Sequence, residues 1–589
     1  MLKYKLKDTP VKSFSFNYVR DYLETLGIKS TESFIKGPKI EDEETYKNLD
    51  RIEEACRELY LGFKNNKKFF LQVDSDADGY TSSAIFYAFF KRLFPEAKIE
   101  WRVHDGKEHG IILDTVPISA DYIIIPDAGS VQFDEQKELS AKGYKVIIID
   151  HHNISPNYER YENVIIVNNQ SSVNFKNKSL SGAGVVYKTI QAFNNYYKDE
   201  FPMIYEDYAD LAAIGIVADM MDTRELDNNF IIHKGRNNIV NPMLKALIKK
   251  QSFSISNEDC PNKIDIAFYI APIINAVIRF GMEEEKNQLF EGFIDYFSEE
   301  KQIITQYRGN ERVEQYYDYI ARISFNVRGK QNREKEKNMN FLIEKIEKEN
   351  LDKHQLIAVK ISKDEVSIPH TITGLVAMEL LKKYKKPVLV LRPKSDGNGG
   401  TIYAGSGRGK ANGDFDSLYR MLRESKLCEF VEGHDMAHGV AIHEKNFDKV
   451  IDFANEYLKE IEFDVEEYEV DYIFNNNNLN LDMIYQFGKY IDLYGNSIPQ
   501  PKFAFELNVA KTAVSFLKDG KTLKISLNGM EYIKFHAKSI IEEMESFDAM
   551  MYKIKIVGRA QLNHWNGNIT PQIVIDELEF EPIEIKSLF

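Results

Sequence analysis

The sequence predicts an α/β protein of several domains: a parallel-sheet domain, a long helical connector, a smaller α/β domain and a C-terminal β-barrel. Three observations support this prediction. The 589 residues are too many for a single hydrophobic core. Between about 60 and 220, near-continuous Ile/Val runs alternate with segments of helical periodicity, as in a parallel sheet covered on both faces. After about 465, short strand-like runs at regular spacing indicate a small barrel or sandwich.

The first α/β domain begins with a strand, "KKFFLQV" (Lys67–Val73), followed by "YTSSAIFYAFFKRLF", whose apolar residues have helical spacing. "ADYIIIPD" ends a second strand at Asp127, "YKVIIIDHHN" ends a third at Asp150, and "ENVIIVNNQ" is a fourth. The segment "YEDYADLAAIGIVADMMD" is then expected to be a helix with Asp219 near its end.

The remaining regions follow from changes in charge and periodicity. A strongly charged stretch with apolar residues at helical spacing predicts one or two long connecting helices. "KPVLVLRP" and "TGLVAMELLKKY" mark strands and helices of a second α/β region, and the N-terminal segment is expected to be a mixed, partly helical leader. The predicted boundaries are 1–50 for the leader, 51–285 for the first α/β domain, 286–350 for the connector, 351–462 for the second α/β domain and 463–589 for the barrel-like end.

The composition excludes several classes of protein. A net charge of −15 argues against a generally basic protein that coats nucleic acid, although a local basic groove remains compatible with it. Cys56, Cys260 and Cys428 are scattered without metal-type spacing, which predicts free thiols in a reducing compartment. The first twenty residues lack an apolar signal-peptide region, and no apolar run is long enough to span a membrane. We therefore expect a cytoplasmic protein without membrane association.

The stretch "VDSDADGYTSSA" begins like an EF-hand calcium loop. Such a loop needs a bidentate Glu at its twelfth position, and counting from Asp74 that position is Ile85. The stretch also follows a strand instead of a helix. Because ligand sites of open α/β sheets lie at the carboxyl ends of strands, this position favours a different kind of cation site.

Carboxylates and histidines end three successive strands, and a parallel sheet would bring these ends to one edge. Oxygen and imidazole ligands without thiolate suit Mn²⁺ or Mg²⁺ better than structural zinc, and so many anionic ligands indicate two ions. The alternative is that each Asp merely caps a helix or closes a turn. The candidate residues are Asp74, Asp76, Asp78, Asp127, Asp150, His151, His152 and Asp219.

The motifs "VDSDADGYTSSA", "IIPDAGS", "IIIDHHN" and "AAIGIVAD" resemble the four successive motifs of the DHH phosphoesterase superfamily. "WRVHDGKEHGI", "LSGAGVVYK" and "APIINAVIRFG" resemble core segments of its RecJ branch. "AGSGRG" and "VEGHDMAHG" resemble the paired signatures of a DHHA1 domain, and "YGNSIPQPKFAFE" and "LNHWNGNITPQIVIDE" resemble the terminal OB-fold. The resemblance covers roughly residues 45 to 589 in the family's order.

The resemblance also implies roles for individual residues. Asp150 is expected to orient a neighbouring histidine instead of binding metal directly. The implied metal ligands are Asp74, Asp76, Asp78, Asp127, His151, His152 and Asp219, with Asp76, Asp78, Asp127, His151 and His152 also catalytic. The implied contacts to phosphates and nucleic acid are Arg102, Arg279, Ser406, Arg408, His434 and, as a stacking platform, Trp565.

Five positions depart from the family pattern without removing an implied metal ligand. Ala128 replaces an Asn, Ile273 and Ile278 replace an Arg and a Gly, Glu432 replaces a Gly, and His438 replaces an Ala. Each is expected to alter phosphate contacts, end preference or substrate length. Glu432 near a phosphate path would be unfavourable unless it is paired.

The resemblance implies an exonuclease that uses two Mn²⁺ or Mg²⁺ ions to hydrolyse single-stranded DNA from the 5′ end to mononucleotides. Its setting would be DNA repair, recombination or phage DNA metabolism. Single-stranded DNA is the implied partner, and a single-strand-binding protein or a helicase are candidate protein partners. Two alternatives remain. One is an enzyme of the same superfamily acting on short RNAs or cyclic dinucleotides, and the other is a non-catalytic single-strand-binding scaffold.

Overall fold

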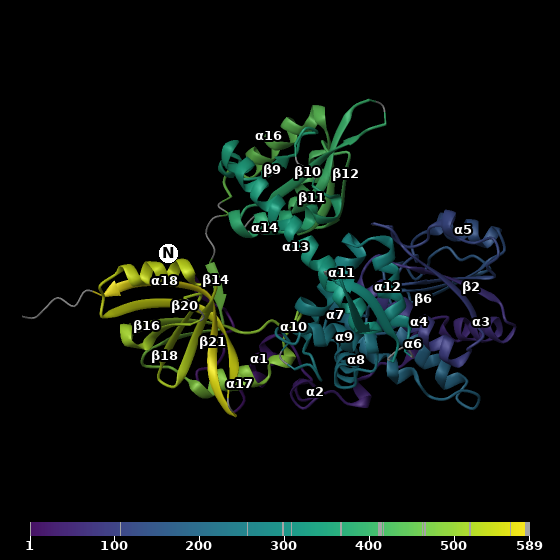
Figure 1. The fold of residues 1–589 in the computed structure, drawn as a ribbon, viewed down its shortest axis with the longest axis horizontal. Helices are drawn as coiled ribbons and strands as arrows, with labels where there is room; N and C mark the ends of the chain where they lie inside the picture. The colour runs from purple at the N-terminus through teal and green to yellow at the C-terminus, as the bar shows by residue number, and fades with distance from the viewer. Residues whose placement is uncertain are drawn as a thin grey trace, which may run out of the picture. The chain divides into compact units, whose positions relative to one another are not determined.

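The computed structural model describes residues 2–106, 108–255, 257–296, 300–307, 309–365, 368–397, 399–409, 415, 417–461, 463, 467–517, 520–565 and 567–583, without the side chains of Tyr307, His434 and Trp565. The chain forms two compact units. The first comprises residues 1–325 and 469–589, and the second comprises residues 326–468 (Figure 1).

The α/β domain of the first unit is built on a five-stranded sheet in the order β3-β2-β4-β5-β6. All of its strand pairs are parallel, as the Ile/Val runs predict. The strands are β2 (Lys68–Val73), β3 (Lys98–Val103), β4 (Tyr122–Pro126), β5 (Lys145–Asp150) and β6 (Val164–Asn168). Since β4 and β6 are buried along their whole length, both faces of this sheet are covered.

Helices cover the sheet and extend the domain. Leu139 of α5 joins an apolar cluster with Ile123, Val146 and Ile148 of the sheet, and α6 contacts β5. Helix α4 packs against both α6 and α7. The bounds are α3 (Ile52–Lys64), α4 (Ala77–Leu93), α5 (Phe133–Ala141), α6 (Gly182–Tyr196), α7 (Ala209–Ala218), α8 (Leu226–Asn237), α9 (Pro242–Lys250), α10 (Lys263–Asp265), α11 (Ala271–Phe280) and α12 (Glu283–Ile294).

The connecting segment contains a hairpin that the sequence did not predict. Strands β7 (Gln302–Tyr307) and β8 (Asn310–Gln315) pair antiparallel after α12, and the 33-residue helix α13 (Tyr316–Lys348) follows. Helical spacing predicted α13 correctly. The hairpin was missed because neither strand shows an alternating apolar face. Ile304 and Val313 pair across it, and both side chains are exposed.

The second unit contains a mixed five-stranded sheet in the order β12-β13-β11-β10-β9. Only β9 and β10 pair in parallel; the other pairs are antiparallel. The strands are β9 (Ile357–Lys360), β10 (Val388–Ser395), β11 (Thr401–Arg408), β12 (Phe430–His434) and β13 (Ala437–His443), and the helices are α14 (Thr373–Tyr384), α15 (Leu418–Ser425) and α16 (Phe447–Tyr457).

The C-terminal part of the first unit is a seven-stranded sheet in the order β15-β16-β20-β21-β19-β18-β17. A register shift between Val557 and Gly558 bends the long β20–β21 pair. The elements are β14 (Glu467–Val470), β15 (Tyr472–Asn475), α17 (Leu481–Lys489), β16 (Lys502–Ala510), β17 (Val514–Leu517), β18 (Thr522–Leu527), β19 (Met530–Phe535), α18 (Lys538–Ser546), β20 (Met551–Trp565) and β21 (Asn568–Ile583).

The N-terminal segment packs into the core of this C-terminal sheet. It forms β1 (Lys3–Leu6), α1 (Tyr18–Thr25) and α2 (Thr31–Ile35). Val19, Tyr22 and Leu23 of α1 share a buried cluster with residues of α17 and β16. The sequence did not predict this packing, because nothing in residues 1–50 identifies a partner more than 400 positions away.

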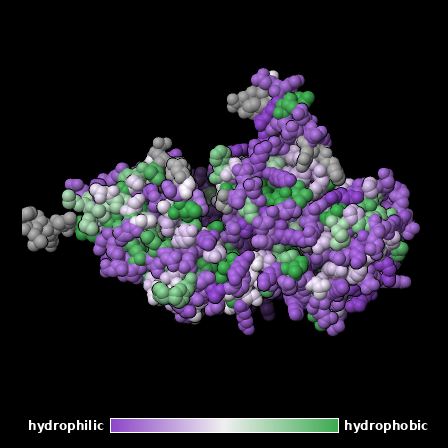
Figure 2. All heavy atoms as spheres, turned by 90° about the horizontal axis from the view of Figure 1, so that it is seen from below, coloured by the Kyte–Doolittle hydropathy of each residue, from purple (hydrophilic) through white to green (hydrophobic). Residues whose placement is uncertain are grey.

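On the face shown in Figure 2, hydrophilic residues predominate and hydrophobic residues form small, separated patches. Among the residues that the structure describes, no helix combines the length and apolar character needed to cross a lipid bilayer.

Candidate metal centre

The ends of three parallel strands carry the candidate ligands to one edge of the sheet. Asp74 follows β2, Asp127 follows β4, and Asp150 is the last residue of β5. Ligand atoms lie within 4.8 Å of one another in each of three overlapping groups. These groups are Asp74, Asp76 and Asp127; Asp78, His151 and Asp219; and Asp127, Asp150, His151 and His152. The structure thus brings together all eight residues that the sequence singled out for this edge.

Two helix N-termini face this edge. Asp76 is the N-cap of α4, and its carboxylate accepts a hydrogen bond from the Gly79 N–H at 2.9 Å. The Asp78 carboxylate accepts hydrogen bonds from the Ser181 hydroxyl and from the main-chain N–H groups of Gly182 and Ala183, at the start of α6. Both helix N-termini stabilise negative charge, and these hydrogen bonds fix the orientation of the two carboxylates.

Asp127 is the least satisfied carboxylate of the group. It is buried, and within the described part of the chain its Oδ1 atom has no hydrogen-bond donor. Its backbone has φ +68°, a conformation that Asp tolerates better than most residues. A Cβ atom at Gly182 would lie 2.1 Å from this Oδ1, so only glycine fits beside it. The geometry leaves an anionic oxygen available for a cation.

Burial and mutual repulsion shift the protonation of these carboxylates. Burial raises the pKa of Asp127 well above its ordinary value, and Asp78, Asp76 and Asp74 raise it further. Burial also raises the pKa of Asp219 to about 8, with added repulsion from Asp78 and Asp76. Such shifts are the result of crowding carboxylates without a counter-ion, and a bound divalent cation would reverse them.

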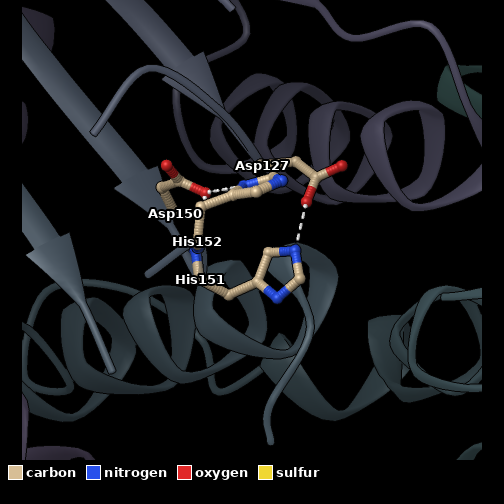
Figure 3. A group of neighbouring side chains, drawn as sticks. All are labelled: Asp127, Asp150, His151 and His152. Carbon is tan, nitrogen blue, oxygen red and sulfur yellow. Dashed lines mark hydrogen bonds and ion pairs between the residues drawn. The ribbon is translucent and has the colours of Figure 1, made fainter. Parts of the chain in front are cut away.

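The Asp-His-His segment places its two imidazoles differently (Figure 3). His151 directs Nε2 toward Asp127 Oδ1 at 3.3 Å and lies 3.5 Å from Asp219 Oδ2. His152 Nδ1 donates instead to Asp150 Oδ1 at 2.8 Å, which leaves Nε2 of His152 as its ligand atom. Burial lowers the pKa of His152, but the bond to Asp150 outweighs it and raises this pKa to about 9.

Asp150 is fully buried and well satisfied. Its carboxylate accepts from the main-chain N–H groups of Ser130, His151 and His152 as well as from the His152 imidazole. Burial alone would raise the Asp150 pKa, but the bond from His152 and the nearby imidazoles hold it below its ordinary value. This arrangement fits the expectation that Asp150 orients a histidine.

The donor set fits hard divalent cations. Carboxylate oxygens and two imidazole nitrogens converge without a thiolate, and one buried oxygen lacks a donor among the described residues. Such ligands suit Mn²⁺ or Mg²⁺. Asp127 belongs to two of the three groups and His151 to two, as expected if neighbouring ions have ligands in common.

The pH dependence of stability should reveal the crowded carboxylates when metal is absent. The folded pKa of Asp219, about 8, lies above its ordinary value of 3.8, so between these values the folded state holds a proton that the unfolded state releases. In chelator, the free energy of unfolding should therefore fall as pH rises from about 4 to about 8. Chemical denaturation at several pH values measures this slope. Mn²⁺ should reverse this dependence of the free energy of unfolding on pH, and Asp219→Asn should make it flatter. An equal slope with chelator and with Mn²⁺ would show that repulsion among the carboxylates does not raise the Asp219 pKa.

Three further residues support the cluster, and the sequence reasoning did not single them out. His109 Nδ1 lies 2.8 Å from Asp74 Oδ2, and the Ser181 hydroxyl donates to Asp78. Asn275 Oδ1 accepts from the Ala77 N–H at the start of α4. His109 lies in the quoted stretch "WRVHDGKEHGI", but a loop histidine gives no spacing signal that predicts its partner.

The predicted phosphate-binding residues fall in both units. Arg102 lies on β3 and pairs with Glu108 at 2.9 Å. Arg279 is exposed on α11. Burial raises the pKa of Asp76, and the positive charge of Arg279 partly opposes this rise. In the second unit, Ser406 Oγ lies 2.9 Å from Thr373 Oγ1, and the Arg408 guanidinium borders Gly374 at the start of α14. The side chains of His434 and Trp565 lie outside the described residues.

Four of the five residues that depart from the family pattern are buried. Ala128, Ile273 and Ile278 are completely buried, so they pack in the core of the first unit. His438 is buried beneath Gly407, where a Cβ atom would lie 2.2 Å from its Nε2. Glu432 pairs with Gly439 across β12 and β13.

Comparison with known proteins agrees with this geometry. The model of the DHH family N-terminal domain matches residues 68–216, and the model of the RecJ OB domain matches residues 470–577. A prophage-derived protein of Bacillus subtilis named as a single-strand DNA-specific exonuclease, YorK, is 35% identical over 98% of both chains. The single-stranded-DNA-specific exonuclease RecJ of the same species is 23% identical over 89% of this chain and 63% of its own length.

Among solved structures, RecJ from Thermus thermophilus in complex with Mn²⁺ matches with a TM-score of 0.69 and 20% identity, over 96% of this chain and 76% of that chain. The same protein in complex with Mg²⁺ matches with a TM-score of 0.64 and 19% identity, over 96% and 75%. These two matches establish the fold, and the similarity to YorK along almost the whole sequence establishes the family. The chain therefore belongs to the RecJ-like branch of the DHH family, the single-stranded-DNA-specific exonucleases.

Proposed function

We propose that this protein hydrolyses single-stranded DNA from its 5′ end to mononucleotides, with two Mn²⁺ or Mg²⁺ ions held by the carboxylate–histidine cluster. One observation carries the proposal: Asp127 Oδ1 and His151 Nε2 lie 3.3 Å apart at the sheet edge. This Asp127 oxygen is buried and has no hydrogen-bond partner among the described residues. YorK and RecJ are named as exonucleases of single-stranded DNA, and RecJ of T. thermophilus has been solved with each of these ions.

The proposed ligands are the seven residues of the sequence prediction, with Asp150 holding His152 in position. When bound, the ions would supply Lewis-acid activation of a water molecule and stabilisation of the leaving oxygen. The protein supplies the geometry: α4 and α6 fix Asp76 and Asp78 through their N-terminal N–H groups, and Asp150 fixes the tautomer of His152. Arg102 and Arg279 are the proposed phosphate contacts of the first unit, and Ser406, Arg408 and His434 those of the second, with Trp565 as the proposed stacking platform.

The five-part division predicted from the sequence remains part of this proposal, with the segment from 463 onward as a clamp for the strand. The 5′→3′ direction rests on the family resemblance. We also propose a cytoplasmic role in DNA repair, recombination or phage DNA metabolism, in which a single-strand-binding protein or a helicase would supply the strand. The phage setting is supported by the relatives that Bacillus phage SPbeta and its prophage carry.

End-labelled substrates test the direction and the substrate class. We expect labelled mononucleotides to be released from 5′-labelled single-stranded DNA early in the reaction, with Mn²⁺ or Mg²⁺ and not with chelator. Label released first from the 3′ end would refute the direction. Activity confined to RNAs of two to about five nucleotides would instead support the short-RNA branch of the superfamily, and tight DNA binding without hydrolysis would support a scaffold.

A further inference from the structure

A second, smaller site lies away from the metal ligands, where three segments of the first unit meet. A cavity of about 220 Å³ is bounded by residues 34–38 at and after the end of α2, by α8, and by residues between 489 and 493 at and after the end of α17. Lys263, the first residue of the short helix α10, also lines it. The cavity thus joins the N-terminal segment, the catalytic domain and the C-terminal sheet.

Lys263 is unusual among the buried lysines. Its side chain is 3% exposed, and no acceptor among the described residues bonds its Nζ atom. Lys188 is equally buried, but its Nζ lies 3.1 Å from Glu43 and 2.7 Å from Asp227. The surroundings of Lys263 thus lack the carboxylates that those of Lys188 contain. A buried ammonium group without an acceptor is strongly unfavourable, so a bound anion would stabilise the charged form of Lys263.

Lys263 lines both this cavity and a second one of about 460 Å³. Its aliphatic stem packs against Gly495, which lines the second cavity, while the charged groups that influence its amine are Arg236 and Asp492, both of which line the 220 Å³ cavity. Burial lowers the pKa of Lys263 to about 7, and the positive charge of Arg236 lowers it further. Both effects oppose a protonated amine in the absence of a bound anion.

The lining of the cavity is positively charged overall. Arg236 is 9% exposed and shares its guanidinium between Asp492 at 2.8 Å and the main-chain oxygen of Pro261 at 3.0 Å. Asp492 is the only carboxylate among the lining residues, and about half of its side chain is exposed. The other basic side chains at the cavity are Lys36, His233 and Lys489. One half-exposed carboxylate therefore pairs with Arg236, and Lys263 has no carboxylate bonded to it among the described residues; Lys36 at the rim pairs with Glu32 at 2.6 Å.

We propose that this cavity binds the phosphate group of inorganic phosphate or of a nucleoside monophosphate, with Lys263 and Arg236 as its principal contacts and His233 at its edge. A phosphate dianion supplies the acceptors that the Lys263 ammonium lacks, and it balances the excess positive charge. The volume admits one phosphate group with its hydrogen-bonding shell. The site is separate from the proposed hydrolysis and does not depend on it.

Binding there would have a structural consequence. Lys36 and Gly37 belong to the N-terminal segment, His233 and Arg236 to α8, and Asp492 to the segment after α17. A phosphate at Lys263 would contact groups from these separate segments at once. It would therefore stabilise the junction between the catalytic domain and the C-terminal sheet.

The test uses the full-length protein in chelator, so that phosphate cannot bind through metal at the carboxylate cluster. Thermal unfolding is followed with millimolar phosphate against chloride of equal ionic strength, and dialysis with radiolabelled phosphate measures the affinity. We expect phosphate to raise the Tm by about 2 °C or more. In Lys263→Met the Tm without phosphate should be unchanged or higher, and the Kd for phosphate should rise by about 10- to 100-fold.

Two other variants serve as controls. Lys188→Met should lower the Tm, because it leaves Glu43 and Asp227 unpaired, but it should retain the phosphate effect. Asp492→Asn removes the competing carboxylate and should tighten phosphate binding several-fold. A 5′-deoxynucleoside monophosphate that binds more tightly than inorganic phosphate would identify a nucleotide as the natural ligand. The proposal is overturned if phosphate has no effect on the wild type, or if Lys263→Met and wild type respond equally.

Discussion

Asp127→Asn is expected to reduce the rate of DNA hydrolysis by about 10³-fold or more, while the metal-free protein becomes no less stable than the wild type. The two effects have the same origin. Asp127 is buried among Asp74, Asp76 and Asp78, and burial followed by their repulsion raises its pKa. Removing its charge relieves that repulsion in the folded state but also removes an anionic ligand shared by the proposed ions.

Asparagine is the suitable replacement for two reasons. It has nearly the same volume, so the space beside Gly182 is not changed, and it tolerates the left-handed backbone conformation at φ +68°. Alanine at this position would add backbone strain to the chemical effect, which would make a loss of stability hard to interpret.

Release of mononucleotides measures the activity, and thermal unfolding with chelator and with Mn²⁺ measures the stability. The wild type should gain stability from Mn²⁺, and Asp127→Asn should gain much less. Asp134→Asn, an exposed aspartate in the first turn of α5, is the matched control and should behave like the wild type. Normal hydrolysis by Asp127→Asn would show that the metal assignment is wrong. In that case His151→Ala should also be active; this variant removes the imidazole that faces Asp127.

Asp150→Asn, unlike Asp127→Asn, should destabilise the metal-free protein, by about 2–3 kcal/mol. The Asp150 carboxylate is fully buried and accepts four hydrogen bonds, three of them at Oδ1. An Asn side chain that keeps its oxygen toward His151 and His152 turns its amide N–H₂ toward the Ser130 N–H, so two donors face each other. The buried negative charge that holds the His152 imidazole would also be lost.

Loss of that charge should weaken metal binding by about 10- to 100-fold, because the orientation of His152 is no longer fixed. Titration of Mn²⁺ against activity measures this effect, and denaturation in chelator measures the stability. His152→Ala separates the two contributions: its side chain is about half exposed, so it should lose metal affinity with little loss of stability. If Asp150→Asn is as stable as the wild type, the hydrogen bonds to this carboxylate do not contribute to the free energy of unfolding.

The sequence was sufficient to predict the edge at which the candidate ligands meet. Asp74, Asp127 and Asp150 each end a strand rich in apolar residues, and parallel strands place their carboxyl ends together. The tight approach of Gly182 to Asp127 was not predictable, because glycine also occurs at helix starts where no other side chain lies close to it. The bond from His109 to Asp74 was missed since it depends on how a loop folds back, and loops carry no periodicity.

Local sequence patterns also could not predict which distant elements pack together. The helical spacing of α1 is readable, but its partner is α17 and the C-terminal sheet. Lys263 illustrates a third limit. Its position in "CPNKIDIAFY" has no distinguishing mark, and only the folded arrangement shows that its ammonium group lies beside Arg236 without an acceptor among the described residues.

The packing of α1 among C-terminal residues also determines when the protein can finish folding. Val19, Tyr22 and Leu23 leave the ribosome well before the strands that cover them are synthesised. The catalytic sheet is complete once about residue 170 has been made, so it can form while these apolar side chains still lack their partners. A nascent chain would thus acquire its cluster of acidic side chains before its C-terminal sheet, and an incompletely translated chain would expose the apolar face of α1, which favours aggregation.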